Sequence, residues 1–171
     1  MAGTGWTNKK IDEIVAEERT ELGVRRRSRF DPYVLAEHHG LDCIEIGLLP
    51  DEFCREAAVQ HFLRDRQAAW SAALVPLGTA RIILENDSHS MARRRASVSH
   101  EIGHFLLEHD FDDVLLTDDG CRHFDKRLEK QADHFACELL LPEKDAVWGL
   151  FRKWSAGEGV SGRAAGVVSL R

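Results

Sequence analysis

The sequence predicts an α+β domain in which a small antiparallel or mixed sheet packs against two long helices. Three short runs, at 42–46, 70–75 and 79–85, have the pattern of strands. Two longer stretches, at about 90–109 and 125–141, repeat apolar residues at helical spacing. With 171 residues and 43% hydrophobic content, the chain can bury a sizeable core. One compact domain fits this length.

Composition limits the compartment and the partners. No apolar run approaches the ~18–20 residues that a membrane span needs, and the start of the chain lacks a continuous apolar signal segment. We therefore expect a cytoplasmic protein without a membrane partner. A net charge of -6 and a pI near 5.8 argue against direct nucleic-acid binding, so the expected partner is a protein.

The cysteines show neither a disulfide framework nor a zinc finger. Their positions are scattered, without the CxxC spacing that a cysteine-type zinc site uses. We expect free thiols at all four, which are Cys43, Cys54, Cys121 and Cys137.

Two helices are predicted before the first strand. Apolar residues lie on one side of Asn8–Leu22, with Asn8 or Thr7 as the N-cap. The basic run 25–29 is expected to be a solvated linker in a chain this acidic. Asp31 can cap a second, short helix that has proline at its first position and ends at His39 before Gly40.

The predicted strands form a small sheet. Residues 42–46 alternate polar and apolar side chains, which indicates one buried face. Residues 50–58 predict a helical turn, followed by a return to extended runs. The runs 70–75 and 79–85 flank Pro76-Leu77-Gly78, a connection of hairpin length. We expect 81–84 to be an exposed edge that could receive a peptide as an added strand.

The stretch from about Ser90 to His109 contains His100-Glu101-Ile102-Gly103-His104. On a helix, His100 and His104 lie one above the other and can bind one zinc ion, while Glu101 can take a proton from water. A lone histidine on an apolar face is usually structural, but this pair with a glutamate favours metal binding. We assign His109 no ligand role, because residues i and i+5 of a helix do not share a face.

Two further features of this helix carry expectations. A glycine inside a helix costs about 1 kcal/mol relative to alanine, so Gly103 indicates that another element packs closely against that turn. The three arginines at 93–95 are expected to fill early, exposed turns.

A catalytic zinc generally has three protein ligands, and Glu129 is the best candidate for the third. It lies at the edge of an apolar stripe on a helix that Asp125 can cap and that Pro142 ends. Asp133, one turn further on, can accept a hydrogen bond from His100 or His104. The alternatives are that Glu129 and Asp133 form a solvated face, or that His123 or His134 is the ligand.

Three blocks of the sequence resemble the ImmA/IrrE family of metallopeptidases. They are 31–44, an early helix and strand; 95–107, around the HExxH motif; and 129–142, a closing motif that ends at proline. The resemblance implies a zincin-like, gluzincin-like domain with Glu129 as third zinc ligand. Zn²⁺ is the expected single ion, with Mn²⁺ or Fe²⁺ as alternatives. Ala96-Ser97 depart from the family's usual Phe-Thr, although every metal position survives.

The resemblance also implies a function. Relatives cleave helix-turn-helix repressors in stress responses, on mobile elements or in toxin–antitoxin operons, so we expect a zinc-dependent endopeptidase acting on a repressor encoded nearby. Glu101 would be the general base, and Tyr33, His123 and His134 are candidate oxyanion donors. The alternative is a non-catalytic zinc-containing module that sequesters a regulator. A secreted digestive protease is less favoured because a signal segment and a propeptide are not apparent.

The predicted organisation has three parts. Residues 1–30 form an N-terminal helix and basic linker, 31–154 the zincin-like peptidase domain, and 155–171 a C-terminal tail with a short helix. A helix is also expected over 143–154.

Overall fold

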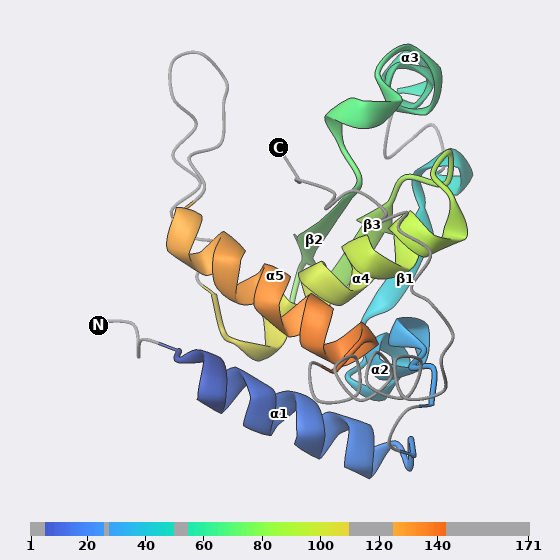
Figure 1. The fold of residues 1–171 in the computed structure, drawn as a ribbon. Coiled ribbons are helices and arrows are strands. Elements are labelled where there is room, and N and C mark those ends of the chain that lie inside the picture. Colours follow the sequence, from blue (N-terminus) through green and yellow to red (C-terminus); the bar gives the residue numbers. More distant parts are fainter. Residues whose placement is uncertain (1–5, 26–27, 50–54, 110–124, 143–171) are drawn as a thin grey trace, which may run out of the picture.

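The computed structural model describes residues 6–25, 28–49, 55–109 and 125–142, which form an α+β fold with a three-stranded mixed sheet (Figure 1). Its long helices and its strands are α1 (Asn8–Glu21), α2 (Pro32–His38), β1 (Asp42–Glu45), β2 (Ala72–Leu77), β3 (Ala80–Glu85), α4 (Met91–Leu106) and α5 (Lys126–Leu140). Short helical turns are η1 (Ile46–Leu48), α3 (Glu56–Gln60), η2 (His61–Asp65) and η3 (Gln67–Ala69).

The helices begin where capping residues predict. Thr7, Asp31 and Asp125 each accept a hydrogen bond from a backbone N–H in the first turn of α1, α2 and α5. Ser90 does the same for α4. Because such caps act locally, these helix starts depend little on the rest of the fold.

The predicted hairpin is present. Strands β2 and β3 pair antiparallel, with Leu77 opposite Ala80. The connection is therefore the two residues Gly78 and Thr79, and the glycine takes a φ of 60°. Pro76 and Leu77, which were predicted to lie in the connection, belong to β2 instead.

The expectation that 81–84 form an exposed edge is wrong. The strand order is β1-β3-β2, and β1 pairs parallel to β3 with Cys43 opposite Ile83. Ile83 is fully buried, as expected for a central strand. In the described part of the chain, the free edge on the hairpin side belongs to β2.

Helices cover the sheet in successive layers. Helix α4 packs on β2 and β3, α5 packs against α4, and α1 lies along α5 (Figure 1). The shared core takes side chains from all of these elements, including Ile11, Val15, Leu35, Leu74, Ile83, Val98, Ile102, Phe135 and Leu139. Helix α1 therefore contributes to the same core that positions α4 and α5. The predicted domain boundaries remain predictions.

Helix α3 agrees with the predicted turn over 56–58, but helical turns continue over 59–69, where extended runs were expected. Asn86, which is fully buried, donates through its side chain to the carbonyls of Phe62 and Trp70. Its backbone N–H bonds to Ser71 at the start of the hairpin. One buried asparagine at the end of β3 thus holds this segment, and the local sequence pattern does not show such a contact.

The expected exposure of the arginines at the start of α4 is also incorrect. The Arg94 guanidinium lies 2.7 Å from Glu85 Oε1 and 2.6 Å from Glu45 Oε1. Tyr33 donates its hydroxyl proton to Glu85 Oε2 over 2.8 Å. Arg94 therefore joins α4 to both neighbouring strand ends and, through Glu85, to α2.

Other expectations are met in part or lie outside the described residues. Cys43 and Cys137 are free thiols, as predicted. The helix expected over 143–154 and the start of the turn at 50–58 lie outside the described ranges. No helix in the described part of the chain has the length and apolar character needed to cross a membrane.

Candidate metal centre

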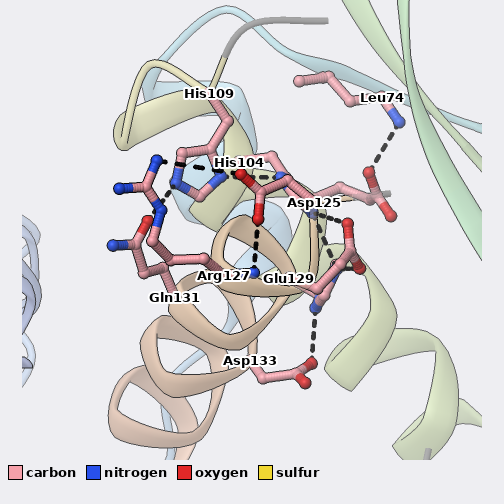
Figure 2. Close-up of polar contacts among 10 residues, drawn as sticks. Leu74, His104, His109, Asp125, Arg127, Glu129, Gln131 and Asp133 are labelled. Carbon is pink, nitrogen blue, oxygen red and sulfur yellow. Dashed lines mark hydrogen bonds and ion pairs between the residues drawn. The ribbon is translucent and has the colours of Figure 1, made fainter. Parts of the chain in front are cut away.

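Two neighbouring helices bring three metal-ligating side chains together. His100 and His104 project from one face of α4, and their Nε2 atoms lie 3.0 Å apart. Glu129 from α5 places Oε2 3.3 Å from His100 Nε2 and Oε1 3.3 Å from His104 Nε2. The chain folds so that α4 and α5 contact each other at the level of these residues (Figure 2).

The residues present fit a zinc ion. Zinc bonds to nitrogen and oxygen are about 2.0–2.1 Å long, so neighbouring ligand atoms of a tetrahedral site lie about 3.3 Å apart. The separations of 3.0–3.3 Å in this cluster are close to that value. Two imidazoles and one carboxylate are also the ligand set of catalytic sites that keep one position open. His100, His104 and Glu129 are therefore a group that could hold a metal ion.

The close approach of the two helices depends on Gly103. A Cβ atom at this position would lie 3.1 Å from the ring of Phe135 and 3.2 Å from its Cβ. Phe135 is fully buried in α5, six residues after Glu129. The close packing predicted from Gly103 is confirmed, and its partner is the helix that carries the carboxylate.

Of the two histidines that the sequence offers as partners for Asp133, the structure shows contact with His100. Asp133 Oδ1 lies 2.9 Å from His100 Nδ1, so the carboxylate holds the ring with Nε2 facing Glu129. Burial alone would lower the pKa of His100, but its bonds to Asp133 and Glu129 outweigh that effect and raise the pKa to about 10. Without metal, His100 is therefore protonated at neutral pH.

The same contacts keep Glu129 ionised. Burial alone would raise the pKa of Glu129, but its contacts with the imidazoles of His100 and His104 outweigh that effect and lower the pKa to about 2. A carboxylate is therefore ready to bind a cation across the whole neutral range.

His109 is the residue that sequence reasoning missed. Its Nδ1 lies 2.9 Å from His104 Nδ1, and its Nε2 lies 3.1 Å from Gln131 Oε1. Figure 2 shows the His109 ring between His104 and Gln131. Burial, followed by the neighbouring imidazole of His104, lowers the pKa of His109 to about 4, so the ring is neutral. His109 is thus outside the group of three that could hold a metal ion, but it contacts one member of that group.

Glu101 is held by the sheet. Its Oε2 accepts a hydrogen bond of 2.9 Å from the backbone N–H of Leu74 in β2 (Figure 2). Burial raises the pKa of Glu101 despite this bond and the neighbouring imidazoles. A buried carboxylate with a raised pKa has the property that a proton acceptor near neutral pH needs.

The remaining predicted residues lie elsewhere or outside the described ranges. His134 Nε2 lies 2.7 Å from Asp12 in α1, which leaves it outside the group of three. The Tyr33 hydroxyl donates to Glu85, and burial is the main reason that the pKa of Tyr33 is raised. His123 falls within 110–124, outside the described residues.

Comparison with known proteins agrees with this geometry. The family model described as the IrrE N-terminal-like domain, Peptidase_M78, matches residues 50–151, more than half of the chain. These bounds include both helices of the cluster. No curated protein and no solved structure gives a significant match. The family match confirms the ImmA/IrrE resemblance, and this chain therefore belongs to the IrrE N-terminal-like family of metallopeptidases.

Proposed function

We propose that this protein is a zinc-dependent endopeptidase with a zincin-like site, in which His100, His104 and Glu129 bind the ion and Glu101 is the general base. The supporting observation is the convergence of three ligand groups from two helices. Glu101 is adjacent in sequence to the first of them and is oriented by a backbone amide of the sheet. Zn²⁺ is proposed, and Mn²⁺ or Fe²⁺ could occupy the same donor set.

The chemistry divides between the ion and the protein. A bound zinc ion would supply Lewis acidity toward the peptide carbonyl and lower the pKa of water toward 7. Glu101 accepts the proton of the attacking water and returns it to the leaving amine. The Leu74 N–H fixes the direction of the Glu101 carboxylate, so the proton acceptor is in place before substrate arrives.

The decisive variant is Glu101→Gln. We expect it to bind one zinc ion per chain while losing about 10²–10⁴-fold in cleavage rate, because the amide cannot accept the proton. Glu37→Gln, an exposed change of the same type on α2, is the matched control and should cleave like the parent. Cleavage at the parental rate by Glu101→Gln would overturn the assignment of the base.

The proposed substrate is a helix-turn-helix repressor or an antitoxin-like regulator, as the family resemblance implies. A co-encoded regulator incubated with substoichiometric enzyme should be cut completely. The competing hypothesis is a zinc-containing module that only sequesters the regulator. Such a module would leave the regulator intact and bind it in a fixed ratio, so that one experiment separates the two functions.

The free edge of β2 is the proposed position of the scissile segment. The Ser71 carbonyl accepts from the Asn86 N–H, so the backbone hydrogen-bonding groups of Ser71 point toward β3. Because these groups alternate in direction along a strand, those of Leu74 and Pro76 point to the free edge. The Leu74 N–H is used by Glu101 and Pro76 has none, so at these two positions the edge offers carbonyl acceptors. Substrates with N-methylated amides beside the cut should lose cleavage; full cleavage would exclude strand addition at this edge.

A further inference from the structure

We propose that His109 and Gln131 are positioning residues that fix the tautomer and orientation of His104. The three side chains form a series of hydrogen bonds, and the backbone carbonyl of Trp6 holds its first member, Gln131, in place. The inference deepens the proposed metallopeptidase function, on which it rests. It assigns a role to three residues that contribute no group to the metal cluster. It also connects the N-terminal segment before α1 to a proposed metal ligand on α4.

The direction of each hydrogen bond follows from the first. The Trp6 carbonyl can only accept, so the Gln131 atom 2.9 Å away is the donating Nε2. Gln131 Oε1 then accepts the proton of His109 Nε2. With its proton on Nε2, the imidazole of His109 accepts at Nδ1, so His104 Nδ1 donates to it. This leaves His104 Nε2 with its lone pair facing Glu129 and His100, as a metal ligand requires.

The hydrogen bonds among His104, His109 and Gln131 are shielded from water. Exposure is only 6% for His104, 6% for His109 and 8% for Gln131, so water competes little for these bonds. The other histidine of the cluster is held differently, because the Asp133 side chain is 46% exposed and carries a charge. His104 is therefore held by buried, uncharged side chains, whereas His100 is held by a half-exposed carboxylate.

The backbone explains how residue 109 reaches residue 104. Helix α4 ends at Leu106, the Glu108 N–H bonds to the Phe105 carbonyl, and the His109 N–H bonds to the His104 carbonyl. This is a Schellman ending, which usually has glycine at the position that Glu108 occupies with φ 50°. A non-glycine residue in that conformation costs about 1–2 kcal/mol. The turn carries His109 back to His104, which a continuous helix would not do.

Trp6 contacts both parts of the arrangement. Its indole Nε1–H donates to the Leu107 carbonyl over 2.6 Å, at the C-cap of α4. Its own carbonyl accepts from Gln131 on α5. Trp6 thus holds the C-terminal end of α4 and orients the side-chain amide of Gln131, from which the series of hydrogen bonds begins. The family match begins at residue 50, so this support comes from outside the matched region.

The test is zinc affinity of the full-length protein, measured by competition with a chromophoric chelator. His109→Phe keeps an aromatic ring but removes both hydrogen bonds, and we expect zinc binding to weaken about 10–100-fold. His109→Asn places its amide oxygen where Nδ1 lies, so it should recover most of the parental affinity. His39→Phe, which removes a half-buried bond to Glu18 away from the cluster, is the control and should bind zinc normally.

A second measurement reports the tautomer directly. In the zinc-loaded parent, ¹⁵N NMR should show His104 protonated at Nδ1 and His109 protonated at Nε2. Gln131→Met removes the acceptor but leaves both rings, and it should shift the His109 tautomer populations and weaken zinc binding up to about tenfold. This variant also serves as the test if His109→Phe does not fold.

The outcomes distinguish this inference from the proposed function. If the parent binds zinc and the affinity of both His109→Phe and Gln131→Met is within twofold of the parental value, the positioning role alone is overturned. Equal weakening in His109→Phe and His109→Asn would do the same, because it would indicate packing. Absence of zinc binding by the parent would overturn the metallopeptidase proposal and this inference together.

Discussion

Helix α4 carries two polar clusters that differ in how their charges are balanced. Near its start, Arg94 forms the arginine cluster with Glu85, Glu45 and Tyr33, where donors and acceptors are matched within the protein. Further along, His100 and His104 form the metal cluster with Glu129, where ligand atoms that can all accept protons converge at 3.0–3.3 Å.

This contrast indicates a separate role for each cluster. A guanidinium with fixed donors satisfies the Glu85 carboxylate without any ligand, which is the property of a structural tie. Converging acceptors need a shared positive charge, which a proton on His100 supplies in the metal-free protein and a metal ion supplies when bound. The first cluster should therefore control folding, and the second should control metal binding.

The largest expected effect is removal of the proposed third metal ligand. Glu129→Ala takes the only carboxylate from the metal cluster, so we expect loss of stoichiometric zinc and of cleavage. Elemental analysis of purified protein measures the zinc, and circular dichroism checks the fold. The control is Glu138→Ala on the same helix, outside the group of three. Parental zinc content in Glu129→Ala would remove the basis for separating the clusters.

A change in the arginine cluster should lower the stability of the fold and leave zinc affinity nearly unchanged. Arg94→Met leaves Glu85, whose side chain is 3% exposed, without its counter-charge, and we expect a loss of about 3–5 kcal/mol in unfolding free energy. Urea denaturation measures the loss. Lys9→Met, which breaks the exposed pair with Glu13, should cost less than about 0.5 kcal/mol.

Zinc affinity per folded molecule should stay within about twofold in Arg94→Met, because the arginine cluster contributes no metal ligand. A large loss of zinc affinity with little change in stability would show that the two clusters are coupled.

Local signals made part of this molecule predictable. Asp31 and Asp125 start helices through bonds to the next turn, and the HExxH spacing places two imidazoles on one helix face. Gly103 indicates another element packed closely against its turn, and that element is α5 with Phe135. Glu129 was the preferred third group because its helix, its spacing and the family resemblance agreed.

Long-range pairing and an unusual turn account for what the sequence did not show. The parallel pairing of β1 with β3 makes β3 central, although nothing in the hairpin sequence encodes that partner. Arg94 is drawn inward by the carboxylates at two strand ends. His109 reaches His104 through a turn with Glu108 where the usual signal is glycine.

The raised pKa of His100 makes zinc binding pH-dependent. Below a pKa of about 10 the metal must displace one proton, so zinc affinity should rise about tenfold for each pH unit across the neutral range. Glu129, with a pKa lowered to about 2, adds no slope there. Titration calorimetry in buffers of different ionisation enthalpy should detect about one proton released. Release of no proton would contradict a protonated His100.

The metal-free protein should show the opposite trend. A histidine with a raised pKa contributes stability that is fully present below its ordinary value of 6.5 and is lost as pH rises toward 10. We therefore expect the His100 contribution to unfolding free energy to fall over this interval. A His100→Gln variant, compared with the parent by urea denaturation, isolates that contribution. Parallel pH profiles for the two proteins would contradict the assignment.

The smallest expected effect tests whether helix spacing transmits to the metal cluster. In Gly103→Ala, better helix propensity gains up to about 1 kcal/mol, but contact with the fully buried Phe135 costs about 1–3 kcal/mol. We expect a net loss of about 1 kcal/mol and a few-fold weaker zinc binding, because α5 carries Glu129. Adding Phe135→Leu makes room for the new methyl group, so the double variant should bind zinc better than the separate changes predict. Strictly additive effects on zinc affinity would show that the crossing of α4 and α5 tolerates the methyl group without moving the carboxylate.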